Sequence, residues 1–81
     1  MQVRVYVTPR KGILDPQGRA VESSLHTLGF KNVSRVKVGK YIVLEVDAAT
    51  ASEARAEAMK MCEALLANPV IEVYRFEVDG E

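Results

Sequence analysis

The chain has 81 residues, enough for one domain, and its 11 Lys and Arg residues balance 11 Asp and Glu residues. A domain of this size buries only about 60–65% of the surface that its unfolded chain exposes, so its stability alone is marginal and association is favoured. The zero net charge argues against binding to nucleic acid or to an anionic membrane by bulk electrostatics.

The first quarter of the chain predicts a strand followed by a helix. Residues Gln2–Thr8 alternate β-branched and polar side chains, which is typical of a strand with one apolar face. A helix is predicted from Pro16 to about Leu28, and Gly29 suits its left-handed C-terminal cap. We expect one stripe of this helix to pack on the first strand. The stripe consists of Val21, Leu25 and Leu28.

Several residues of the loop Arg10–Gly18 favour a particular backbone conformation. Gly12 tolerates a positive φ, and Asp15 precedes a proline, so its carboxylate can accept from the free amides of the following helix. Ile13 and Leu14 are apolar residues in an otherwise polar connection. Apolar side chains in such a loop predict a contact that covers them.

The middle of the chain predicts a β-hairpin. The pattern predicts an edge strand over Val33–Val38, whose basic side chains would prevent pairing with a further strand. It predicts the turn at Gly39-Lys40 and the second strand over Tyr41–Asp47. Gly39-Lys40 lacks the other residues of a phosphate-binding loop.

The last part predicts a helix and a strand. Thr50 and Glu53 have the spacing of a capping box, and Asn68-Pro69 ends the helix that they begin. Val70–Val78 forms the last strand. The order βαββαβ indicates a single α+β domain over residues 1–81, ferredoxin-like, with two helices on one face of an antiparallel sheet.

The helix-free sheet face is predicted to be unusually apolar. It carries Tyr6, Tyr41 and Val43, joined by Tyr74 or its neighbours. Such a face is best explained by a second copy of the chain or another protein that packs on it. Association through the sheet edges, or by exchange of strands, stays open as an alternative.

The sequence offers no convincing catalytic or metal site. His26 has no second ligand at workable spacing and reads as a surface residue, and Cys62 reads as a packing residue because no nearby base lowers its pKa. Asp15 and Glu53 are explained by capping, and no pair of carboxylates is forced together. The pair Arg10-Lys11 fits either contact with a phosphate or acidic surface or two solvated charges.

Cellular location is indicated by what the sequence lacks. It has one cysteine, no apolar run near the ~20 residues that span a bilayer, and no signal-peptide pattern at its N-terminus. We therefore predict a cytoplasmic protein that binds neither nucleic acid nor membrane.

Five segments of the chain together match the pattern of one known family. They are Val-Tyr-Val-Thr-Pro-Arg-Lys-Gly (5–12), Leu-Asp-Pro-Gln-Gly (14–18), Leu-Gly-Phe (28–30), Val-Gly-Lys (38–40) and Met-Cys-Glu-Ala-Leu-Leu-Ala-Asn-Pro-Val-Ile-Glu (61–72). Each segment alone is weak, but the ordered set at this length is specific. On these segments the chain resembles the PurS family of small subunits of phosphoribosylformylglycinamidine (FGAM) synthase.

The resemblance implies a noncatalytic scaffold in a ligase that forms C–N bonds with glutamine as amido donor. It implies a PurQ-like glutaminase, a PurL-like synthetase that holds ATP and Mg, and a homodimer or dimer of dimers of the small subunit that assists ammonia transfer between them. No catalytic, cofactor or metal residue is expected in this chain. The alternative is a ferredoxin-like domain that senses small molecules. Partner contact is expected from Arg10, Lys11, Ile13, Leu14 and Lys40, and dimer contact from Tyr6, Tyr41, Val43 and Tyr74.

Overall fold

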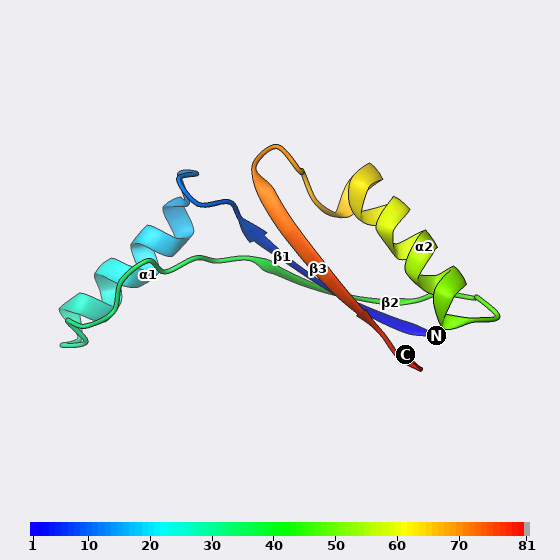
Figure 1. Ribbon diagram of the computed structural model, residues 1–81. Helices are drawn as coiled ribbons and strands as arrows, with labels where there is room; N and C mark the ends of the chain where they lie inside the picture. The colour runs from blue at the N-terminus through cyan, green and yellow to red at the C-terminus, as the bar shows by residue number, and fades with distance from the viewer. Residues whose placement is uncertain (81) are drawn as a thin grey trace.

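The computed structural model describes residues 1–80 and shows one antiparallel sheet with two helices (Figure 1). The strands have the order β2-β1-β3, so β1 lies at the centre and pairs with both neighbours. The elements in chain order are β1 (Gln2–Pro9), α1 (Pro16–Thr27), β2 (Lys40–Glu45), α2 (Ala51–Met61), the short π-helix η1 (Cys62–Leu66) and β3 (Glu72–Val78).

The core lies between one face of this sheet and α2. Val3, Val5 and Val7 of β1 are fully buried, as the alternation in the first strand predicts. Ala54 and Ala58 of α2 are also fully buried, because their small side chains let the helix approach the sheet closely. The predicted capping box starts α2, since the Thr50 hydroxyl accepts from the Glu53 amide at 3.1 Å.

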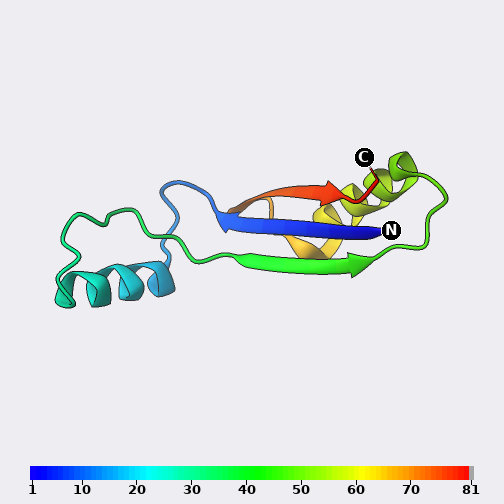
Figure 2. The same ribbon diagram turned by 90° about the horizontal axis from the view of Figure 1, so that it is seen from below.

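The predicted edge strand Val33–Val38 and the hairpin at Gly39-Lys40 are both wrong. This segment forms no strand within the chain and continues away from β2 without turning back (Figure 2). Its amides are taken by α1 instead: Val38 N–H donates to Asp15 at 2.9 Å, and Val36 N–H to Glu22 at 3.2 Å. Arg35 has a φ of 57°, which further interrupts an extended conformation.

The predicted packing of the first helix on the first strand is also wrong. Helix α1 and its flanking segments lie beyond the end of the sheet, on the opposite side of the molecule from α2 (Figures 1 and 2). The radius of gyration is 15.9 Å, whereas about 12 Å is typical of a compact domain of this length. We call residues 10–39 the arm and the remaining described residues the body.

The apolar stripe of α1 is consequently left open. Leu28 is 73% exposed, and Val21 is also exposed. None of the helices within residues 1–80 is both long and apolar enough to cross a membrane.

Candidate partner-binding surfaces

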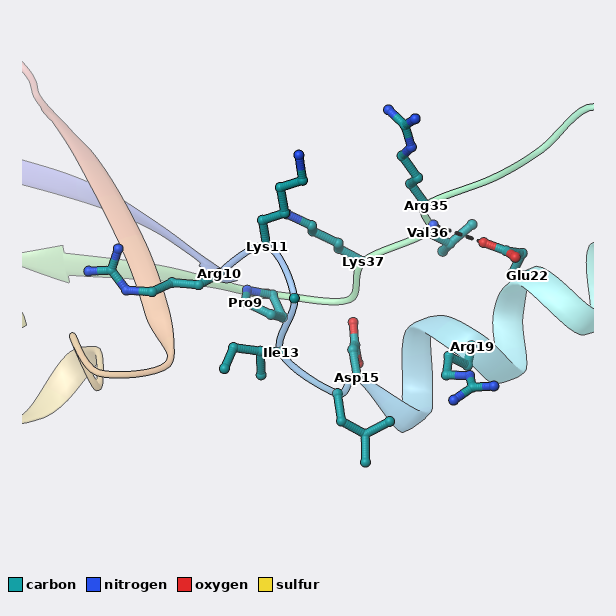
Figure 3. A pocket seen from close by; sticks show the side chains of 12 residues that line it. Pro9, Arg10, Lys11, Ile13, Asp15, Arg19, Glu22, Arg35, Val36 and Lys37 are labelled. Carbon is teal, nitrogen blue, oxygen red and sulfur yellow. Dashed lines mark hydrogen bonds between the residues drawn. The ribbon is translucent and has the colours of Figure 1, made fainter.

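A cleft of about 740 Å³ lies where the arm leaves the body (Figure 3). One wall is the loop between β1 and α1, and the other is the segment that returns from α1 toward β2. The cleft is lined by Pro9, Arg10, Lys11, Gly12, Ile13, Leu14, Asp15, Arg19, Glu22, Arg35, Val36 and Lys37. The structure therefore gathers four of the five predicted partner-contact residues at one cleft.

Asp15 fixes the shape of this cleft. Its carboxylate accepts from Gly18 N–H at 3.1 Å, which caps α1 as predicted, and from Val38 N–H at 2.9 Å. These bonds, that from Val38 foremost, lower the pKa of the Asp15 carboxyl below its ordinary value. Gly18 is buried at this contact, and a Cβ at its position would lie 2.4 Å from the Val36 carbonyl oxygen, so a larger residue does not fit without movement. The bond from Val38 to the Asp15 carboxylate and the close approach of Gly18 to Val36 thus hold the start of α1 against the returning segment.

Arg10 joins the cleft to the body. Its Nε–H donates to the Pro69 carbonyl at 2.8 Å, and its backbone amide donates to the Ile71 carbonyl at 2.8 Å. The Lys11 side chain instead points away from the loop, as does that of Arg35, and both extend to the same side in Figure 3. Arg10 therefore has a clear structural role, whereas Lys11 is available to a partner.

The cleft is positively charged. Five of its lining residues are Lys or Arg, against two carboxylates, Asp15 and Glu22, that accept backbone amides. The apolar residues beside them are exposed: Leu14 is 69% exposed and Ile13 is 39% exposed. A surface of this kind suits an acidic partner that also carries apolar side chains.

Lys40, the fifth predicted contact residue, lies elsewhere. Its ammonium donates to the Leu66 carbonyl at 3.2 Å and lies 3.8 Å from a carboxylate oxygen of Glu72. It therefore connects the start of β2 to the segment between η1 and β3, and it is not a lining residue of the cleft.

A second surface is the sheet face opposite α2. The rings of Tyr6 and Tyr41 have centroids 5.2 Å apart, and the Arg75 guanidinium lies 3.9 Å from the Tyr6 centroid. A hydrogen bond with Glu77 raises the pKa of the Tyr6 phenol. Val43 and Tyr41 are exposed beside them. Three of the four predicted dimer-face residues therefore lie together on the open face.

The placement of Tyr74 on that open face is wrong. Tyr74 pairs with the fully buried Val7, so both point toward α2. Its hydroxyl donates to Glu63 at 2.6 Å, and this bond raises the pKa of Tyr74 to about 12. The neighbours of Tyr74, Val73 and Arg75, occupy the open face instead, which was the alternative that the sequence left open.

Within residues 1–80, no three His, Cys, Asp or Glu side chains lie close enough to hold a metal ion. Burial raises the pKa of the Cys62 thiol, which makes its thiolate scarce. The His26 ring shares a 2.7 Å hydrogen bond with the Val33 carbonyl.

Sequence reasoning missed three cations of the cleft. They are Arg19 of α1 and, in the returning segment, Arg35 and Lys37, which the pattern of Val33–Val38 predicts as basic residues of a sheet edge. Six Lys and Arg residues between positions 10 and 37, against two Asp and Glu residues, were the signal that could have found them.

Comparisons with known proteins agree along almost the whole chain. The PurS family model, described as phosphoribosylformylglycinamidine (FGAM) synthase, matches residues 2–80. The PurS subunit of that synthase from Synechocystis is 49% identical over 93% of this chain and 75% of its own, and that from Bacillus subtilis is 42% identical over 96% and 92%. A chain in the structure of PurLQS from Thermotoga maritima superposes with a TM-score of 0.84 at 34% identity, covering 94% of this chain and 93% of its own. With the observed sheet and helices, this similarity confirms the predicted ferredoxin-like α+β class.

Proposed function

This chain belongs to the PurS family of FGAM synthase subunits, and on that basis we propose that it is the noncatalytic scaffold of this enzyme in purine biosynthesis. The observation that carries the proposal is the match to the family over residues 2–80. The Thermotoga maritima structure, whose name combines PurL, PurQ and PurS, supports an assembly with two further subunits. We place this assembly in the cytoplasm.

The proposed division of chemistry leaves the reaction to the larger subunits. A PurQ-like glutaminase releases ammonia from glutamine, and a PurL-like synthetase uses ATP, with Mg, to convert formylglycinamide ribonucleotide into FGAM. Ammonia must cross between them unprotonated, because ammonium has no lone pair with which to attack. A scaffold assists this transfer by holding the two subunits so that bulk water is kept from the path. It binds neither ATP nor metal itself.

Reconstitution tests this role. We expect the isolated chain to show no turnover with glutamine, ATP and the ribonucleotide. Added to the other two subunits, it should raise glutamine-dependent synthesis far more than synthesis from supplied ammonia, because only the first requires transfer. An equal rise in both rates would contradict the proposal.

The positive cleft is the proposed contact with a larger subunit. Lys11 extends from it, and Ile13 and Leu14 supply exposed apolar area next to the charge. An acidic and partly apolar partner surface would cover both features. The contact should weaken as salt is raised, since exposed charges are screened beyond about 8 Å at physiological ionic strength.

Charge reversal tests this contact. Lys11→Glu should weaken capture of the chain by the other subunits while its melting temperature stays unchanged, and Arg10→Glu combined with Lys11→Glu should weaken it further. The single variant keeps the bond from Arg10 to Pro69 intact, so it separates contact from structure. Lys60→Glu, on the exposed surface of α2, is the matched control. Equal binding by Lys11→Glu and Lys60→Glu would show that the cleft is not the contact.

The same cleft favours a second candidate function, a sensor of small anionic molecules. Its volume of about 740 Å³ and its five cations suit a phosphorylated metabolite. The two functions are separated by thermal melts of the isolated chain with purine intermediates and amino acids. A ligand-dependent rise in melting temperature would favour the sensor, and its absence across the set would remove it.

We also propose that the chain works as a homodimer or a dimer of dimers. The open sheet face with Tyr6, Tyr41 and Val43, and the exposed stripe of α1, both leave apolar area for a second copy.

A further inference from the structure

Strand β3 has one edge without a partner strand. Within residues 1–80 it pairs only with β1, so it is the outer strand of the sheet on the side away from β2 (Figure 2). Its seven residues pair with β1 without a bulge, and none of them is proline. Proteins commonly protect an open edge by shortening, bending, interrupting or covering the strand. An edge that stays regular over seven residues is therefore suited to pairing with a further strand.

The backbone bonds show which residues of β3 face this open edge. The amide of Asp79 donates to the Gln2 carbonyl at 3.0 Å at one end of the pairing. At the other end, the amide of Arg10 donates to the Ile71 carbonyl at 2.8 Å. Bonded residues alternate along an antiparallel strand, so the odd-numbered residues of β3 bond to β1. The even-numbered residues turn their amides and carbonyls outward, and those along the middle and end of the strand are Tyr74, Phe76 and Val78.

The side chains of β3 form two different rows. Phe76 pairs with the fully buried Val5, so the even-numbered row faces α2. The rings of Tyr74 and Phe76 are stacked with centroids 6.5 Å apart, yet both residues are only half-buried. The odd-numbered row faces the open side of the sheet, and there Arg75 lies 3.5 Å from Glu77. The edge is therefore apolar on one face and carries both signs of charge on the other.

From these observations we propose that two copies of the chain pair through the open edges of β3. The two strands run antiparallel about a two-fold axis at Phe76. Phe76 then lies opposite Phe76 of the partner subunit, and Tyr74 lies opposite Val78 of the partner subunit. The two three-stranded sheets join into one continuous sheet. The inference names one interface of the homodimer or dimer of dimers proposed above, and it rests on that proposal.

The charges select this register. An axis at Phe76 sets the outward-turned residues opposite one another, as hydrogen bonding between the strands requires. It also sets Arg75 opposite Glu77 of the partner subunit, and the symmetry repeats this pair. An axis one residue away, at Arg75 or at Glu77, would set a like charge opposite itself. Cross-strand pairs of opposite charge and of aromatic rings stabilise a sheet, whereas like charges destabilise it.

The edge is complementary to itself, which favours a second copy as its occupant. In the proposed register each apolar residue of the row facing α2 lies opposite an apolar residue. Both charges on the other face lie opposite their counter-charges, although a single sequence supplies them. An isologous interface uses the same patch on both copies and therefore requires this property. Because each copy has one open β3 edge, the pairing ends at two copies.

Exchange of charge tests the pairing. Arg75→Glu gives each copy two acidic residues at the interface, and Glu77→Arg gives each copy two basic residues. Each variant alone should repel itself, so light scattering across a dilution series should show one association step weakened at least tenfold. An equimolar mixture of the two variants should recover this step, because every acidic residue then lies opposite a basic residue.

The mixture separates contacts between copies from contacts within one chain. Both variants lose the internal ion pair between Arg75 and Glu77, and mixing does not restore it. Lys60→Glu, on the exposed surface of α2, changes the net charge as much as Arg75→Glu does, and it should leave the step unchanged. Edge pairing is overturned if the variants associate like the original chain, or if their mixture fails to recover the step.

A backbone substitution covers the case in which the charge variants fold poorly. Phe76→Pro removes an amide that points toward the partner and leaves the bonds to β1 in place, whereas Phe76→Leu keeps this amide. Both variants lose the aromatic ring. We expect the association step to be at least tenfold weaker for the proline variant than for the leucine variant, with equal helix content by circular dichroism. Equal association of the two variants would overturn the pairing.

The oligomeric state separates failure of this inference from failure of the proposed homodimer. A chain that stays monomeric up to millimolar concentration contradicts both. A dimer whose association ignores the charge variants and Phe76→Pro contradicts only the pairing through β3. Tyr41→Lys, near the other edge of the open sheet face, should then weaken that dimer if it packs face to face, whereas a dimer paired through β3 should tolerate it.

Discussion

Gly18→Ala measures how tightly the arm is built. In an ordinary helix interior the change from Gly to Ala stabilises by about 1 kcal/mol. Here the added Cβ would lie 2.4 Å from the Val36 carbonyl oxygen and 2.5 Å from an oxygen of Asp15. Neither neighbour can move freely, because Asp15 is bonded to Val38, and overpacking of this kind costs about 1–3 kcal/mol.

We expect the overpacking to exceed the gain in helix propensity, with a net loss of about 1–2 kcal/mol in the free energy of unfolding. For a domain of this size each kcal/mol lowers the melting temperature by about 4–8 °C. Urea titration and thermal melts followed by circular dichroism give both quantities. Amide exchange of Val38 should also accelerate in Gly18→Ala, since its acceptor on Asp15 is displaced.

Ser24→Ala is the matched control, because Ser24 is exposed on the same helix. Its effect should stay within about 0.5 kcal/mol. If Gly18→Ala instead stabilised the protein by about 1 kcal/mol, α1 would behave as a free helix, and the close contact with the returning segment would be refuted.

Three further measurements test the body and the cap. The phenol of Tyr74 should titrate near pH 12 in ultraviolet absorbance, and Glu63→Gln should move this midpoint toward about 10. Because the pKa of Tyr74 is raised in the folded state, the hydrogen bond from Tyr74 to Glu63 stabilises the fold below about pH 10, and this stabilisation is lost as the pH rises through 12. The lowered pKa of Asp15 has the opposite sign, so its contribution is present above about pH 4 and is lost as the pH falls further, and Asp15→Asn should flatten that acid limb in urea titrations. Val5→Ala should cost about 2–3 kcal/mol in urea titrations, because Val5 is fully buried, while Val70→Ala at an exposed site should change stability by less than about 0.5 kcal/mol; similar values for both would contradict the described core.

Features that depend on neighbours in sequence were predictable. The alternation of Gln2–Thr8 fixed a strand that the structure extends by one residue to Pro9. The caps at Asp15 and Thr50 both form, because a side-chain oxygen needs only the next turn of the helix to complete the bond. Their geometry is local, so no tertiary contact competes with it.

Features that depend on contacts between residues far apart in the sequence were not predictable. The pattern of Val33–Val38 suits a strand, but Glu22 and Asp15 offer acceptors to its amides and replace a neighbouring strand. The sequence predicts that Tyr74 or its neighbours lie on the open face, because both parities of the last strand carry apolar residues. Pairing with Val7 and the bond to Glu63 decide its side, and neither is visible before the register is known.

The misplacement of α1 follows from what a hydrophobic pattern encodes. An apolar stripe records that one helix face is selected to be covered, and it carries no information about which chain supplies the cover. Intramolecular packing of α1 would need the chain to reverse at Gly39, but Gly39 lies against the Val7 carbonyl, and the segment continues in line with β2. The sequence therefore carries a βαββαβ pattern, whereas the described chain forms only three strands and leaves one helix apart from its sheet.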